Sequence, residues 1–104
     1  MARIAALVPD LMFATKVEAT LSAAGHEVEI VSSPEAIDAA DLLIADLGEI
    51  EPSELTGRGV PVLGFYSHVE TETRRRAETA GVDLVVPRSR MAREMPALVD
   101  SLVG

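Results

Sequence analysis

The sequence predicts an α/β fold, a three-layer sandwich in which helices cover both faces of a parallel sheet. Five short and almost wholly apolar segments recur along the 104 residues, which suits strands buried on both faces. Segments with helical spacing or turn residues separate them, and the connections are brief. Aromatic residues make up only 3% of the chain, so aliphatic side chains and methionine must fill the core. We expect a single domain spanning residues 1–104.

The first unit is a strand followed by a helix. Ile4–Val8 is apolar throughout, and Asp10 can cap the helix that follows because its carboxylate can accept from free amides of the first turn. Gly25 stands where a helix end favours a left-handed residue. The buried stripe of this helix is predicted at Phe13, Val17, Leu21 and Ala24.

The second unit supplies an edge strand and a short helix. Val28–Val31 alternates with charged neighbours, which indicates partial exposure. Ser33-Pro34-Glu35 has the composition of a helix start, and the helix is expected to end near Ala40. Leu42–Ala45 is then a buried third strand that delivers Asp46 at its carboxyl end.

The second half continues the alternation. Residues 47–59 are expected to form a loop with a short helix around Ser53–Leu55. Val60–Phe65 is the fourth strand, with Pro61 at its start because proline cannot donate to the ladder. A capping box at 67–70 predicts a helix from about 68 to 80, which Gly81 ends.

Leu84–Val86 is the fifth strand, and a last helix follows it. This helix starts at Ser89 and is kinked at Pro96, or it starts near Met95. Its apolar stripe is Met91, Met95, Leu98 and Leu102.

Composition excludes several classes of function. The chain has no cysteine, which removes disulfides and thiol chemistry, and no apolar stretch approaches 18 residues, so we expect no membrane span and a cytoplasmic location. The formal net charge is −8, and residues 1–52 carry all of it, with ten acids and two bases. An acidic surface of this kind repels phosphate backbones, so nucleic acid is not an expected partner.

Polar residues at the carboxyl ends of the strands are the candidates for function, because ligands of parallel sheets gather at that edge. Asp46, which follows an apolar strand directly, is the most informative of them. Asp41 precedes the same strand, so it belongs to the opposite edge, where we expect a role in solubility alone.

Four segments together resemble the receiver (CheY-like) domain of response regulators. They are SAAGHEVEIVSSPEAI (22–37), DLLIADL (41–47), GVPVLGFYSH (59–68) and AETAGVDLVVPRS (77–89). The resemblance implies a flavodoxin-like fold with strand order 2-1-3-4-5 and a phosphoacceptor at Asp46. It implies a phosphoprotein of two-component signalling, whose partner is a histidine kinase or a separate effector.

The residues around Asp46 depart from the receiver pattern. Receivers place two or three acids after the first strand to hold a divalent ion, whereas this chain has only Asp10 there. Asp10 either caps the helix or joins Asp46 in holding magnesium. The receiver lysine corresponds to Pro87 in one register and to Arg88 in the other, and an arginine would keep the attraction but change its geometry.

Three further residues are expected to line the site. Tyr66 stands where receivers carry a small hydroxyl, Ser67 is beside it, and His68 is either a proton donor, ligand or pH sensor, or a plain surface residue. Five arginines form a candidate partner face, because receivers often pair through the corresponding elements, and a homodimer is one outcome. They are Arg74, Arg75, Arg76, Arg90 and Arg93. The alternative for the first three is a solvated cluster that Glu70, Glu72 and Glu78 balance.

These features predict a stand-alone, atypical receiver-like signalling domain that acts through protein–protein interaction, with a degenerate phosphoacceptor site at Asp46. The alternative is a flavodoxin-like module that binds a small ligand or anion at the same edge, through Arg88, Tyr66, Ser67 and helix amides. A bare structural or oligomerisation domain is a third reading. We expect no enzyme, since the sequence offers no nucleophile–base pair.

Overall fold

The computed structural model describes residues 2–67 and 71–103, and these form one five-stranded sheet. The strand order is β2-β1-β3-β4-β5 and every neighbouring pair is parallel, which confirms the predicted topology. The strands are β1 (Arg3–Leu7), β2 (Glu27–Ile30), β3 (Leu42–Asp46), β4 (Val62–Tyr66) and β5 (Leu84–Pro87). Each lies within two residues of its expected position. Pro61 directly precedes β4, so its missing N–H does not interrupt the hydrogen bonds of the sheet.

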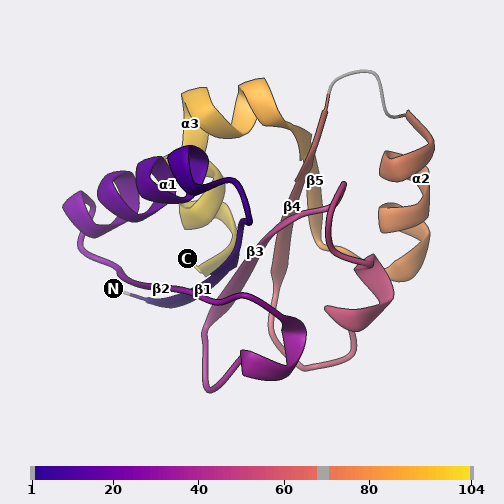
Figure 1. Cartoon of the computed structure of the whole chain (residues 1–104), viewed down its shortest axis with the longest axis horizontal. Helices are drawn as coiled ribbons and strands as arrows, with labels where there is room; N and C mark the ends of the chain where they lie inside the picture. Colours follow the sequence, from indigo (N-terminus) through magenta and orange to yellow (C-terminus); the bar gives the residue numbers. More distant parts are fainter. Residues whose placement is uncertain (1, 68–70, 104) are drawn as a thin grey trace.

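The two faces of the sheet are covered differently (Figure 1). Helices α1 (Leu11–Ala23) and α3 (Arg88–Val103) pack on one face, where alternate strand residues join them in one apolar cluster. The other face carries α2 (Thr71–Ala80) and two 3-10 turns, η1 (Pro34–Ala36) and η2 (Pro52–Glu54). We call these the helix-covered face and the loop-covered face.

The helix expected from Ser33 to Ala40 does not form. Only the turn η1 is present, and Ile37 after it is already extended, with φ −71° and ψ 122°. Ile37 and Ala40 are half-buried while the residues between them are exposed, so too little apolar surface is available to stabilise a longer helix. The short helix expected around Ser53–Leu55 is present as η2, one residue earlier.

The last helix takes the kinked form of the two alternatives. It begins at Arg88, one residue before the expected start, and runs through Pro96 to Val103. Glu94 has non-helical torsions of φ −120° and ψ 21°, because proline two residues later interferes with the preceding turn. The kink still keeps Met91, Met95 and Leu98 buried in one stripe.

The capping box predicted at 67–70 falls largely outside the described residues. Among the residues that the structure does describe, no helix is long and apolar enough to cross a membrane.

Candidate functional site at the carboxyl edge of the sheet

Asp46 is the last residue of β3, and its side chain is partly exposed at the carboxyl edge. Its Oδ1 atom accepts a hydrogen bond of 3.0 Å from the amide of Gly48. The buried run Leu42–Ala45 therefore positions one carboxylate at the edge, as the sequence predicted, and the tight turn after it holds that carboxylate in place.

Asp10 caps α1, and both of its carboxylate oxygens have partners. Oδ1 accepts from the amides of Met12 (3.0 Å) and Phe13 (3.3 Å). Oδ2 accepts from Nη2 of Arg88 at 2.5 Å. The hydrogen bond from Arg88, followed by that from the Phe13 amide, lowers the pKa of Asp10 from its ordinary value of 3.8.

Arg88 joins the beginnings of the two helices on the helix-covered face. It is the first residue of α3, while Pro87 before it ends β5 and lies beside Tyr66. Of these two residues, therefore, Arg88 brings positive charge to this edge. Its guanidinium lies 4.4 Å from the ring centroid of Phe13 and 5.8 Å from that of Phe65. The cation–π contacts and the hydrogen bond to the carboxylate both stabilise this position of the guanidinium.

The two phenylalanines were not predicted as part of this site. Phe13 was assigned to the core stripe of the helix and Phe65 to a buried strand, and both are indeed buried. Their rings meet edge to face at 5.0 Å with an interplanar angle of 65°. The spacing of Phe13 three residues after the capping Asp10 was the available hint, because it places the ring over the first turn.

The side chain of Tyr66 is packed inside the protein and is not exposed at the site. It is the last residue of β4 and is only 5% exposed. The pKa of Arg74 on α2 is raised, mainly by Glu78 and further by Tyr66, which indicates that the phenol oxygen is directed toward α2. Ser67 is exposed beside it, and His68 lies outside the described residues.

The predicted magnesium ligands, Asp10 and Asp46, form an unfavourable donor set. A divalent ion at this edge would need oxygens to coordinate, and those of Asp10 are taken by two amides and a guanidinium. Nowhere in residues 2–67 and 71–103 do three His, Cys, Asp or Glu side chains gather as a metal would require. The residues therefore do not fit the ion that the resemblance implied.

The five arginines of the predicted partner face are mostly engaged within the chain. Ion pairs join Arg74 to Glu78, Arg76 to Glu51, and both Arg90 and Arg93 to Glu94. Arg75 makes no ion pair within the part of the chain that the structure describes. A partner would have to exchange these contacts or use the face around them.

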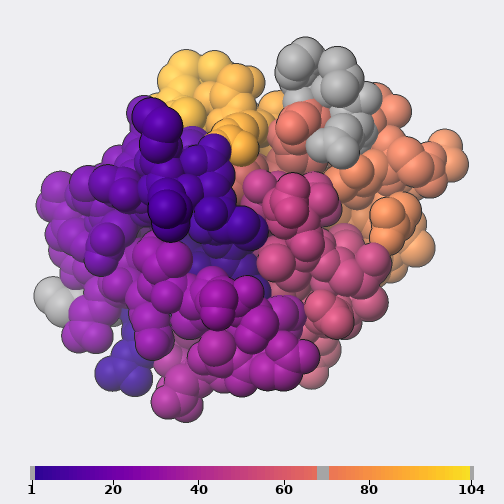
Figure 2. Space-filling model, viewed as in Figure 1, coloured from indigo at the N-terminus to yellow at the C-terminus, as the bar shows by residue number. Residues whose placement is uncertain are grey.

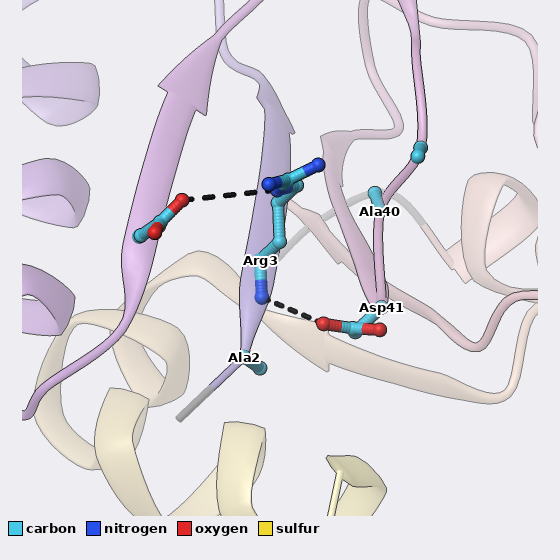
Figure 3. Close-up of a pocket in the computed structure, with 6 residues that line it drawn as sticks. Ala2, Arg3, Ala40 and Asp41 are labelled. Carbon is cyan, nitrogen blue, oxygen red and sulfur yellow. Dashed lines mark hydrogen bonds and ion pairs between the residues drawn. The ribbon is translucent and has the colours of Figure 1, made fainter.

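The opposite edge of the sheet holds a cavity of about 350 Å³ without evident chemistry (Figure 3). Asp41 accepts a hydrogen bond of 2.8 Å from the amide of Arg3, whose guanidinium lies 3.7 Å from Glu27. Asp41 thus satisfies the first amide of β1, which is a structural role rather than the expected role in solubility alone.

The fold of this chain is similar to that of solved receiver and response-regulator proteins. A putative response regulator from Chloroflexus aurantiacus superposes with a TM-score of 0.84 at 18% identity, covering 98% of this chain and 97% of its own. The receiver protein of Burkholderia phymatum gives 0.81 at 18% identity, with coverage of 100% and 96%. NtrX from Brucella abortus gives 0.84 at 17% identity, and this chain spans only 27% of its length.

These likenesses establish the class of fold, which is that of the response-regulator receiver domain. At the level of sequence alone, no family model and no curated protein matches the chain.

Proposed function

We propose that this chain is an atypical receiver-like signalling domain that acts through protein–protein interaction, with a degenerate phosphoacceptor site at Asp46. Its structural neighbours are receiver domains, and such modules work by contacting a kinase or an effector. The observation that carries the proposal is the ion pair between Asp10 and Arg88.

That ion pair removes the charge compensation on which phosphoryl transfer depends. The incoming group and the acceptor carboxylate are both negative, and catalysis rests on cations placed beside them. Here the cation at the edge is Arg88, and Asp10 already neutralises it. Asp10 itself is held by the helix amides, so it cannot turn toward an ion without uncapping α1.

Intact-mass measurement tests the proposal directly. Wild type and Asp46→Asn are incubated with a small acyl phosphate and magnesium, and we expect no added mass in either protein. A gain of one phosphoryl group in wild type that Asp46→Asn abolishes would show a working phosphoacceptor and refute the degenerate site.

Pro9→Asp is the matched comparison, because it rebuilds an acid pair at the end of β1 on an exposed position. Uptake of phosphate by Pro9→Asp, but not by wild type, would identify the missing acid as the cause. Isothermal titration of both proteins with magnesium measures the loss of magnesium affinity directly, without any phosphodonor.

The alternative of an anion-binding module has less support, since Arg88 is paired and Tyr66 is buried. A thermal shift with sulfate, phosphate and nucleotides tests it. Stabilisation of wild type that is lost in Arg88→Gln would favour the alternative over our proposal.

A further inference from the structure

An apolar groove lies on the carboxyl edge, beside the site described above. It is a cavity of about 400 Å³ between the ends of β1 and β2 and the loop that follows β3. Its walls are apolar except for Ser32, and the side chains used here are Leu7, Leu11, Ile30, Val31 and Ile50. The turn η1 begins at Pro34, two residues after Ser32 on the wall of the groove.

Two of the three exposed large hydrophobic residues of the described chain line this groove, and the third is adjacent in sequence to one of them. Leu11 is 79% exposed and Ile30 is 38% exposed, and both line it. Met12, next to Leu11 in the first turn of α1, is 85% exposed. Figure 2 shows the indigo start of α1 on the same face as the purple segment around the end of β2. Apolar side chains grouped in this way at a hollow are typical of an interaction site.

The segments around the groove are acidic in sequence. Residues 7–12, 29–32 and 46–51 contain Asp10, Glu29, Asp46, Glu49 and Glu51, and no lysine or arginine. Arg88 already pairs with Asp10, and Arg76 with Glu51, so neither of these two acids is counted on for a partner. Glu29 and Glu49 are exposed, and neither makes an ion pair within the residues that the structure describes. A partner segment with an apolar side chain flanked by lysine or arginine would therefore match both the apolar walls of the groove and the glutamates beside it.

Charge also decides against two other occupants. A second copy would bring its own net charge of −8, and four of the five arginines on its α2 and α3 faces are already paired internally. An anionic lipid surface would be repelled by the same acidic rim. A basic protein segment meets neither objection.

We propose that this groove binds a basic amphipathic segment of a partner protein, with an apolar side chain seated between Leu11 and Ile30 and cations against Glu29 and Glu49. This deepens the proposed function and rests on it only for the domain's signalling role. It moves the partner face from the arginines to the acidic half of the chain.

The test uses two synthetic 15-residue helices as probes. Both carry the same leucine and methionine face, one with lysine and the other with glutamate on the polar face. We expect the lysine helix to shift the amide resonances at the start of α1, the end of β2 and around Ile50, with a dissociation constant on the order of 100 µM or lower. The glutamate helix should bind at least about tenfold more weakly.

Paired variants separate a groove from general charge attraction. Leu11→Ser with Met12→Ser should weaken the lysine helix about tenfold, while Ala19→Ser with Ala23→Ser, exposed positions further along α1, should not. Glu29→Gln with Glu49→Gln should weaken it severalfold, and Glu18→Gln with Glu72→Gln should do so much less. Absence of binding by the lysine helix, equal binding by both helices, or equal effects of the two serine pairs would each overturn the proposal.

Failure here can be told apart from failure of the proposed function. A chain that binds neither helix and takes up no phosphate loses the groove but keeps its degenerate site. A chain that takes up phosphate at Asp46 loses the proposed function, whatever the helices do.

Discussion

The two faces of the sheet show two ways of closing one core. On the helix-covered face, α1 and α3 bring long side chains such as Phe13, Leu21 and Met91 against the strands. On the loop-covered face, α2 contributes only Ala77 as a buried residue, and turns supply much of the remaining cover through Leu55 and Leu47. A sheet of this fold therefore does not need a regular helix after every strand, provided that packing and hydrogen bonds stabilise the loops that replace it.

Arginine side chains form hydrogen bonds that connect separate elements on both faces, but their partners differ. On the helix-covered face, Arg88 bonds a side-chain carboxylate, that of Asp10. On the loop-covered face, Arg58 donates to the carbonyls of Glu54 (2.9 Å) and Pro34 (3.5 Å), so it bridges η2 and η1. In addition, Nη2 of Arg76 donates to both carboxylate oxygens of Glu51, at 2.8 and 2.9 Å. Loops lack regular hydrogen bonds, and these side chains supply some in their place.

Equal truncations of leucine on the two faces should have the largest effect on stability. Leu21 and Leu55 are both fully buried, one in α1 and the other at the end of η2. Leu21→Ala should cost about 4 kcal/mol of unfolding free energy, and Leu55→Ala about 2–3, because a loop can collapse into the space more easily than a helix. Urea denaturation of both variants measures this, and a larger loss for Leu55→Ala would contradict the distinction.

Gly64 lies in β4 on the loop-covered face, directly under the side chain of Leu47. A Cβ atom there would lie 2.6–2.9 Å from three side-chain carbons of Leu47, which folds over β4 from the loop after β3. Gly64→Ala should therefore destabilise the protein by about 1–3 kcal/mol. In Leu47→Ala the added methyl has room, so the same change should cost much less. Additive losses in the double variant would show that Leu47 is not the obstacle.

Arg58 tests whether the loops are fastened by side chains. Arg58→Gln should lower the unfolding free energy by about 1 kcal/mol and speed amide exchange around η1 and η2. Arg75→Gln is the control, since Arg75 is exposed on α2 and makes no ion pair among the described residues. Equal effects of the two changes would mean that Arg58 contributes charge alone.

The smallest effect concerns Asp10 and depends on pH. Its pKa in the folded chain lies below the ordinary 3.8, so its stabilisation is present above that value and is lost as the pH falls through and below it. Asparagine still caps helices but does not titrate there. The melting temperature of Asp10→Asn should therefore fall less than that of wild type between pH 5 and pH 3. Parallel curves would show that Asp10 does not contribute to acid unfolding.

Much of the fold was readable because its cues are local. The apolar runs that end at Asp46 and Tyr66 are strands, and Gly25 and Gly81 end their helices with positive φ values of 95° and 98°. The helix expected after Ser33 was wrong, although its cap signals were good. Caps start a helix, but an apolar face against the sheet sustains it, and that segment has little.

The carboxyl edge shows the same division. Which residues stand at this edge could be predicted from the sequence, because strand ends follow from apolar periodicity and parallel topology. Tertiary structure alone decided that Arg88 closes on Asp10 over Phe13, across a separation of 78 residues. Such pairing depends on where α1 and α3 begin relative to each other, and no local pattern encodes that distance. Asp46 was predictable at this edge from the sequence. Only the packing of α1 against α3 showed that Asp10 caps α1 and neutralises Arg88.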